Sequence, residues 1–189
     1  MTVQSPTTRA AVTEEDVRRI VREEVARAFA KDPAARRAAI IASKGTLDWA
    51  YPPLILATAA AAAGMQTSVF FTFYGLNIIR RDFDKRLKVD PVGNPAMPMP
   101  VPMPDVVTGM PGMVSLASKM MRSRFARHNV AAIGTLLDSA VELGVRLIGC
   151  QMTVDVFGYS PGDFRDGVEF GGAAAFMSQA RRAHVTLFI

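Results

Sequence analysis

The sequence predicts an α/β fold with three layers, in which a mostly parallel sheet is flanked by helices. Short, continuous apolar runs alternate with helical stretches along the chain. Such runs are typical of strands in a parallel sheet, because helices cover both of its faces. Half of the 189 residues are hydrophobic, which is enough for one such domain with an appendage. The apolar runs predict strands over 38–42, 67–73, 145–149 and 185–189.

Helical spacing, proline and glycine mark the helices between these strands. Pro52 or Pro53 is expected to begin an alanine-rich helix, which ends at Gly64. Ser160 followed by Pro161 is the pattern of a helix N-cap. Two further helices are expected over 131–143 and 173–183.

Residues 1–36 are expected to form a part separate from the α/β domain, which covers 37–189. Residues 1–12 are expected to be disordered. Thr13 then begins a capping-box pattern, and apolar residues recur at helical spacing, which predicts an amphipathic helix over 13–30. The sequence leaves open whether this helix packs on the domain, contacts another subunit or lies on a membrane surface.

Residues 88–121 interrupt the alternating pattern as a Met-Pro-rich insertion. They hold seven of the twelve prolines and seven of the eleven methionines. Proline at alternate positions between Pro98 and Pro104 forbids both a helix and a central strand, so the insertion is expected to be an extended arm. Its methionines favour an adaptable apolar surface, against a partner or over the site, rather than a copper site.

Charge and cysteine content exclude several classes of protein. The formal net charge is +5, but arginine is interspersed with acidic residues, so nucleic acid is not expected as a partner. The single cysteine excludes an intrachain disulfide framework and a multi-cysteine metal site, and it fits a reducing, cytoplasmic location. No metal and no cofactor are expected. The N-terminus does not have the pattern of a secretory signal.

The uncharged stretch from Trp49 to Ile79 raises the question of a membrane span. It is longer than the roughly 20 apolar residues that a spanning helix needs. Gly64, however, divides it into an alanine-rich helical part and a part rich in β-branched and aromatic residues. A soluble α/β core is therefore favoured, with membrane insertion or attachment as the alternative.

Cys150 is the candidate functional residue, because it lies where a buried apolar run ends and a helix begins. Parallel α/β folds place their sites at the carboxyl edge of the sheet, where the loops after the strands meet. Three loops, 43–51, 73–77 and 150–160, are expected to meet there. Backbone N–H groups and the helix dipole favour a thiolate at such a junction, although cysteine is also often buried for packing alone.

Several segments of the domain form a pattern that is specific only when they are taken together. They are Ser43–Ala57, Phe71–Asn77, Val92–Pro100, Cys150–Gly158, Gly167–Ala174 and the terminal Val185–Ile189. Through them the chain resembles the DsrE/DsrF-like family over about residues 38–189, specifically the longer branch with a Met-Pro-rich insertion. The helix predicted over 13–30 lies outside the resemblance.

The resemblance implies a mostly parallel α/β fold and assembly into dimers, trimers or hexamers. It further implies that Cys150 carries sulfur as a persulfide, in a relay with rhodanese and TusA-like carriers, in sulfur oxidation or tRNA thiolation. Such a chain is a sulfurtransferase-like sulfur carrier, and whether it is an enzyme stays open. Some proteins of this branch have a second cysteine or are membrane associated, and peroxiredoxin-family names attach to it.

Residues around Cys150 are candidates to stabilise the persulfide. Backbone N–H groups at a helix start can bind the sulfur anion, and Asp155 can accept a hydrogen bond or order the loop. Each candidate also fits an ordinary loop or helix position. The candidates are Gln151, Met152, Thr153 and Asp155 after the cysteine, and Lys44 and Tyr74 from neighbouring strand ends.

Two other functions stay open. One is a peroxiredoxin-like redox protein with Cys150 as its peroxidatic thiol, which a second cysteine would favour. The other is a non-enzymatic, membrane-associated subunit of a complex that docks through the Met-Pro-rich arm.

Overall fold

The computed structural model describes residues 36–90 and 112–189. All of them lie within one compact unit, Ala34–Ile189. The helix predicted over 13–30 and the centre of the Met-Pro-rich insertion lie outside the described residues. Within these two ranges, no helix has the length and apolar character needed to cross a membrane.

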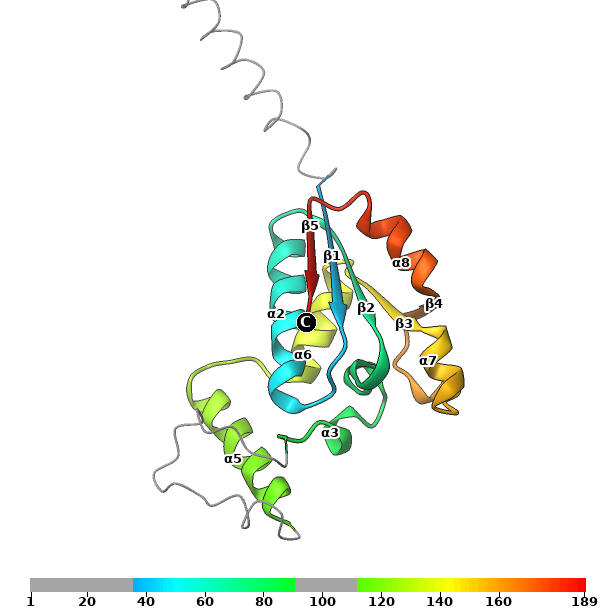
Figure 1. The fold of residues 1–189 in the computed structure, drawn as a ribbon. Helices are drawn as coiled ribbons and strands as arrows, with labels where there is room; N and C mark the ends of the chain where they lie inside the picture. Colours follow the sequence, from blue (N-terminus) through cyan, green and yellow to red (C-terminus); the bar gives the residue numbers. More distant parts are fainter. Residues whose placement is uncertain (1–35, 91–111) are drawn as a thin grey trace, which may run out of the picture. The chain divides into compact units, whose positions relative to one another are not determined.

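Five strands form one sheet, in which every neighbouring pair is parallel. Their order across the sheet is β4-β3-β2-β1-β5 (Figure 1). The predicted parallel sheet is therefore confirmed. The strands are β1 (Arg37–Ala42), β2 (Gln66–Phe71), β3 (Arg146–Cys150), β4 (Val168–Gly171) and β5 (Val185–Phe188).

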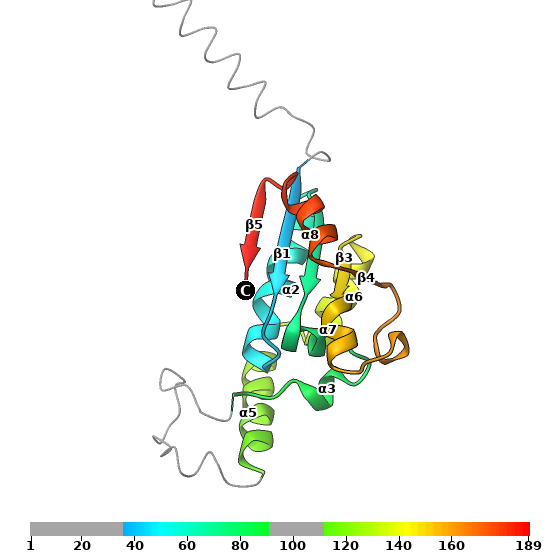
Figure 2. The ribbon, with the colours of Figure 1, turned by 45° about the vertical axis from the view of Figure 1, so that its right-hand side comes forward.

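Helices lie on both faces of the sheet, so the predicted three layers are also confirmed (Figures 1 and 2). Helices α2 and α6 cover one face, and α8 lies on the other. The α-helices are α2 (Leu47–Ala62), α3 (Phe83–Arg86), α5 (Met113–Arg127), α6 (Ile133–Glu142), α7 (Gln151–Val156) and α8 (Ala173–Ala180). Two 3-10 helices are η2 (Phe73–Ile79) and η3 (Pro161–Asp163).

The core consists of two clusters, because successive side chains of a strand point to opposite faces of the sheet. The larger cluster lies beneath α2 and α6 and includes Ile40 and Leu147. The smaller lies beneath α8, where Phe176 packs with Phe70 and Cys150. The thiol is thus on the thinly covered face of the sheet.

The strand β4 was not predicted from the sequence. It has only four residues, lies at the edge of the sheet and contains the charged Glu169. An edge strand need not be a continuous apolar run, because neighbouring elements cover it less completely. Glu169 instead pairs with Arg146 of β3, whose Nη2 lies 2.5 Å from its carboxylate.

The helix α2 begins at Leu47, so the prediction that proline begins it was wrong. Pro52 and Pro53 lie inside the helix, where they remove two backbone hydrogen-bond donors. The first turn forms nonetheless, because Leu47 and Ala50 are fully buried and the N–H of Ala50 bonds to the carbonyl of Thr46 at 3.0 Å.

The prediction of an extended arm over 88–121 was wrong for its last part, which forms the first turns of α5. No proline follows Pro111 within the insertion, and the residues after it include methionine, leucine, alanine and lysine, which favour helix. Gly112 precedes the helix with a φ of 90°, a conformation that glycine adopts readily. Residues 91–111 lie outside the described residues.

Candidate functional site

Cys150 is both the last residue of β3 and the N-cap residue of α7, as the sequence predicts. It is a free cysteine with 4% of its surface exposed, packed in the cluster beneath α8. Its position at the carboxyl edge of a parallel sheet is the one at which α/β folds place their sites.

Two threonine hydroxyls lie beside this thiol. Thr153, in the first turn of α7, is buried, and its Oγ1 lies 3.3 Å from the Oγ1 of Thr72. Thr72 directly follows β2, and the register pairs Phe71 with Gly149, so Thr72 and Cys150 end neighbouring strands. The two hydroxyls therefore come from the segments that follow β2 and β3.

The balance of burial and hydrogen bonding lowers the pKa of the Cys150 thiol. Burial is the largest influence and raises the pKa, because it disfavours the charged thiolate. Hydrogen bonds from the hydroxyl and backbone N–H of Thr153, the hydroxyl of Thr72 and the backbone N–H of Met152 act in the opposite direction and together prevail. The site thus favours the nucleophilic form of cysteine while it excludes water.

The loops at this edge of the sheet are in close backbone contact. The N–H of Gly75 bonds to the carbonyl of Ser43 at 3.1 Å. A Cβ on Gly75 would lie 2.1 Å from the carbonyl oxygen of Ala42, and one on Gly45 would lie 2.2 Å from that of Tyr74. Glycine at both positions lets the loops after β1 and β2 meet, as the sequence predicts for the carboxyl edge.

Phe73, at this edge of the sheet, has an unusual backbone conformation. Its φ is 47°, in a region that bulky residues rarely adopt. Its N–H donates to Oγ1 of Thr153 at 3.4 Å, so this hydroxyl accepts one bond while its own proton stays available for the sulfur of Cys150. The unusual turn thus contributes to the order of the thiol site.

Comparison with known proteins identifies the family. Residues 34–188 match the family described as DsrE/DsrF/DrsH-like. The chain belongs to this family. It is 46% identical over 158 residues to the sulfur carrier protein DsrE2 of Allochromatium vinosum, covering 82% of this chain and 98% of that protein.

Two weaker likenesses were also found. The uncharacterized protein YrkE of Bacillus subtilis is 28% identical over 160 residues, covering 82% of this chain and 97% of YrkE. The crystal structure of the ychN protein from E. coli superposes with a TM-score of 0.51 at 14% identity, covering 82% of this chain and 99% of that one. The second likeness supports the fold alone.

In this member of the DsrE/DsrF/DrsH-like family, the sequence-predicted site residues divide into two groups. Met152 and Thr153 donate to Cys150. The others have their described contacts elsewhere: Gln151 donates to Asp155 at 2.8 Å, Lys44 lies over the ring of Trp49 at 3.4 Å, and the ring of Tyr74 lies 5.8 Å from that of Phe157.

Thr72 was not predicted from the sequence, and only the backbone of Thr153 was. A signal for both was present, because each threonine lies within three residues of a strand end. Recognising their pairing requires the knowledge that β2 and β3 are neighbours in the sheet, which the sequence alone does not supply. Among the described residues, no group of three or more His, Cys, Asp or Glu side chains is arranged to hold a metal.

Proposed function

We propose that this protein carries sulfane sulfur as a persulfide on Cys150 and passes it to a thiol of a partner protein. The observation that carries the proposal is a buried free thiol at the carboxyl edge of the sheet, whose pKa the neighbouring Thr153 and Thr72 help to lower. The relative that is 46% identical bears the name of a sulfur carrier.

The transfer consists of two balanced displacements. The Cys150 thiolate attacks the outer sulfur of a donor persulfide, forming Cys150–S–SH and releasing the donor as a thiolate. The thiolate of an acceptor then attacks the outer sulfur on Cys150, forming the acceptor persulfide and restoring the Cys150 thiolate. No electrons are gained or lost overall, so neither a cofactor nor an oxidant is required.

The hydroxyls and N–H groups around Cys150 act in both displacements. They stabilise the thiolate that begins the first step and leaves in the second, and a lower pKa makes a thiolate a better leaving group. Thr153 and Thr72 are therefore the residues that we assign to persulfide chemistry, together with the backbone of Met152. Gln151, Asp155, Lys44 and Tyr74 stay secondary candidates.

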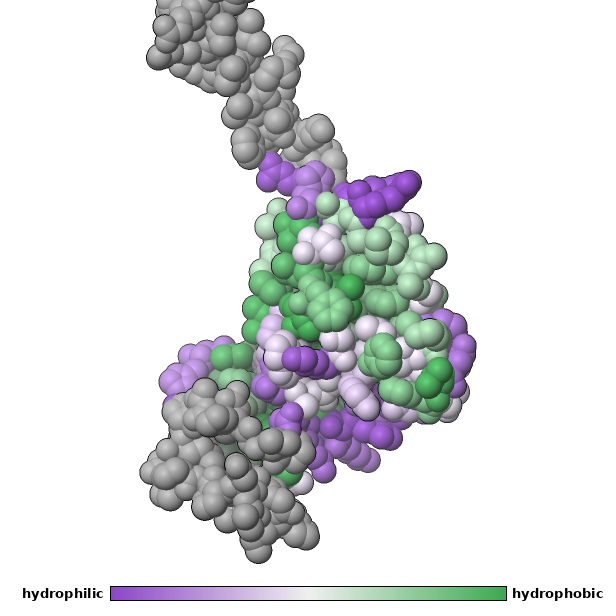
Figure 3. All heavy atoms as spheres, viewed as in Figure 1, coloured by the Kyte–Doolittle hydropathy of each residue, from purple (hydrophilic) through white to green (hydrophobic). Residues whose placement is uncertain are grey.

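The proposed partners follow from the chemistry of the site. A rhodanese fits the role of donor, and a small TusA-like protein that presents its own thiol fits that of donor or acceptor. A homo-oligomer is also proposed, because apolar residues gather over β5 and β1 on one face (Figure 3) and Phe188 of the edge strand β5 is 74% exposed. The single thiol fits a reducing, cytoplasmic compartment.

The N-terminal residues 1–36 are proposed to be an appendage to the domain over 37–189. Peripheral membrane contact through the predicted helix over 13–30 stays part of this proposal. Fractionation of cells that express the full chain, or the chain without residues 1–36, tests it. Loss of membrane association only in the shortened chain supports contact through the appendage, whereas equal fractionation of both chains contradicts it.

Intact-mass spectrometry tests the sulfur-carrier proposal. The reduced protein is incubated with a low-molecular-weight persulfide, and the mass is expected to rise by one sulfur atom, which a thiol reductant then removes. Cys150→Ser is the matched control and is expected to gain nothing. A wild-type protein that gains no sulfur contradicts the proposal. Peroxide consumption that depends on Cys150 and a thiol reductant would instead favour the peroxiredoxin-like alternative.

A further inference from the structure

The helix α7, which holds the donors to Cys150, is too short to be stable by itself. It has six residues, fewer than two turns, and an isolated helix of this length does not persist in water. Only Thr153 and Val154 of its side chains are buried. Contacts from outside the helix must therefore hold it in place.

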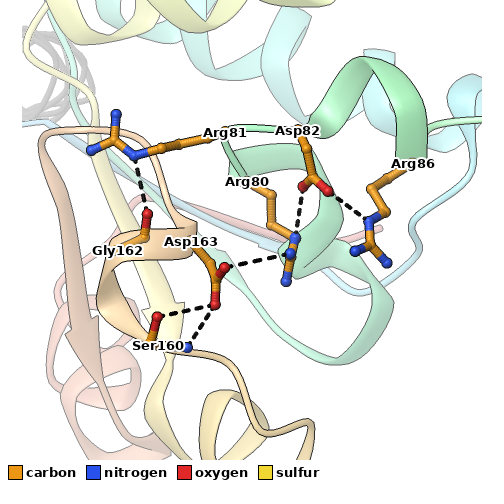
Figure 4. Close-up of polar contacts among 7 residues, drawn as sticks. All are labelled: Arg80, Arg81, Asp82, Arg86, Ser160, Gly162 and Asp163. Carbon is orange, nitrogen blue, oxygen red and sulfur yellow. Dashed lines mark hydrogen bonds and ion pairs between the residues drawn. The ribbon is translucent and has the colours of Figure 1, made fainter.

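One buried arginine contacts the residues that follow α7. Arg80 is 6% exposed and lies at the end of η2. Its Nε donates to Asp82 at 2.9 Å, and its Nη2 lies 3.8 Å from the carboxylate of Asp163 (Figure 4). Its guanidinium carbon lies 4.2 Å from the ring centroid of Tyr159. We call these four residues the Arg80 cluster.

One member of the Arg80 cluster bonds to α7, and a second fixes the segment that follows it. The N–H of Tyr159 bonds to the carbonyl of Val154 at 2.9 Å, which closes the C-terminal end of the helix. The carboxylate of Asp163 accepts from the N–H of Ser160 at 2.8 Å and from its hydroxyl at 3.2 Å. Arg80 therefore lies against both anchors of the segment after α7.

The segment that carries Arg80 also reaches the other end of α7. It begins at Thr72 and Phe73, whose contacts to Thr153 adjoin the thiol. At its far end, the N–H of Arg81 bonds to the carbonyl of Asp163 at 2.9 Å, and the N–H of Arg165 bonds to the carbonyl of Ile79 at 3.1 Å. The segment over 72–81 thus contacts α7 at its start and the chain just beyond its end.

Net stabilisation of the fold does not by itself explain the ion pairs of Arg80. Pairing a buried arginine adds little net stability over an apolar side chain, because removing its charge from water offsets the attraction, although losing a partner leaves the charge uncompensated. Nη1 of Arg80 is buried and has no hydrogen-bond partner among the described residues, so the guanidinium is also incompletely satisfied. An arginine at this position is better explained by a role in fixing the geometry of the neighbouring segments than by a contribution to stability.

We propose that Arg80 is a positioning residue for Cys150, which acts by holding the segments over 72–81 and 151–163 in register so that Thr72, Thr153 and the start of α7 face the sulfur. This role rests on the proposed function, because a lowered thiol pKa at Cys150 serves sulfur transfer. Its test measures the thiol directly, so it can hold or fail independently of sulfur transfer.

The test is a pH titration of the Cys150 thiolate by its ultraviolet absorbance in the full-length protein, which has no other cysteine. The variants are Arg80→Met, which keeps an unbranched apolar side chain, and Arg80→Lys, which keeps the charge but not the planar, forked guanidinium. Both are expected to raise the pKa of the thiol by about one unit, a tenfold fall in the ratio of thiolate to thiol at a given pH. Arg146→Gln is the control, because Arg146 also forms an ion pair, with Glu169 at 2.5 Å, but at the end of β3 opposite Cys150.

Each outcome bears on the proposal. A raised thiol pKa in both Arg80 variants, with the control unchanged, supports it. The proposal is overturned if the thiol pKa of Arg80→Met is unchanged. It is also overturned if Arg80→Lys keeps the wild-type pKa while Arg80→Met raises it, or if the control shows an equal rise. If Arg80→Met does not fold, Asp163→Asn removes one anchor of the cluster and is expected to raise the pKa in the same direction, and no rise there overturns the proposal.

Discussion

Burial by itself raises the pKa of a thiol, yet Cys150 combines near-complete burial with a lowered pKa. The difference comes from hydrogen bonds, of which the hydroxyl and N–H of Thr153 contribute the largest part. A cysteine in an apolar cluster without these donors would be inert. At the scale of the residue, therefore, we propose that the threonines make Cys150 a reactive cysteine rather than a structural one.

Replacing the Thr153 hydroxyl is expected to reverse the pKa shift. Thr153→Val keeps the shape of the side chain but removes a hydrogen bond to a charged group, which is worth about 1.5–3 kcal/mol, so the thiol pKa should rise by about one to two units. Titration of the thiolate absorbance measures it. Thr153→Ser keeps the hydroxyl and should retain most of the shift, and equal values for the two variants would contradict this role.

The contact between the two threonines predicts that their effects are coupled. Thr72→Val alone is expected to give a smaller rise in the thiol pKa than Thr153→Val, because the Thr72 hydroxyl contributes less to the shift. Since their oxygens lie 3.3 Å apart, the double variant should depart from the sum of the two single effects. Simple additivity in the same titration would show that the hydroxyls act separately.

At the scale of the element, the carboxyl edge of the sheet depends on loops whose backbones nearly touch. Gly75→Ala is expected to destabilise the fold by about 1–3 kcal/mol, because the new Cβ would meet the carbonyl of Ala42, which is backbone and cannot rotate away. Gly172→Ala is the control, since its Cβ would have no atom within 4 Å and its φ is −87°. Urea unfolding measures both, and equal stabilities would contradict the account.

The Arg80 cluster predicts how stability changes in acid. Hydrogen bonds from Arg80 and Arg86 lower the pKa of Asp82 to about 2. A carboxyl group whose pKa is lowered by folding stabilises the protein above its unfolded pKa, here 3.8, and this contribution disappears as the pH falls towards about 2. Wild-type stability should therefore decline over this interval.

Substitution of Asp82 tests this linkage. Denaturant unfolding at several acid pH values should give a shallower decline for Asp82→Asn than for the wild type. Asp166→Asn serves as the control, because its carboxylate is 92% exposed and pairs with Arg81 at the surface. Parallel declines for the wild type and Asp82→Asn would show that Asp82 does not contribute.

The elements that the sequence predicts correctly are those with a strong local pattern. The strands β1, β2, β3 and β5 are continuous apolar runs, and the junction at Cys150 follows from one of them. The edge strand β4 and the helix α5 lack such a pattern, and burial of Leu47 overrides the local signal of Pro52 in α2. Local preference is a weak guide where packing decides the conformation.

In the candidate site, too, the sequence predicts what is local to one strand end and not what depends on distant contacts. Cys150 and the N–H groups after it are local to one strand end, so the sequence identifies them. The roles of Thr72 and Arg80 depend on contacts with residues 81 and 83 positions away along the chain. Those contacts depend on the order of strands in the sheet and on the course of the loop after α7, which no local pattern encodes.

At the scale of the whole molecule, the single thiol restricts the mechanism. The chain has no second cysteine, so the sulfur that we propose Cys150 carries must leave to another molecule. The segments beside Cys150 expose large apolar side chains, among them Phe73 and Tyr74 on η2 and Met152 and Val156 on α7. Such side chains are suited to contact with a protein. Met152 and Val156 lie within six residues of the thiol in sequence, and Phe73 contacts Thr153 beside it.

Direct observation of sulfur passing between two proteins tests the central claim. The protein is loaded with one sulfur on Cys150, freed of the donor and mixed with a reduced TusA-like carrier, and the intact masses of both chains are followed. We expect one sulfur atom to leave this chain and appear on the carrier, and carrier whose thiol has been alkylated to receive none. Sulfur that stays on Cys150, or that is lost as sulfide without appearing on the carrier, would contradict the account.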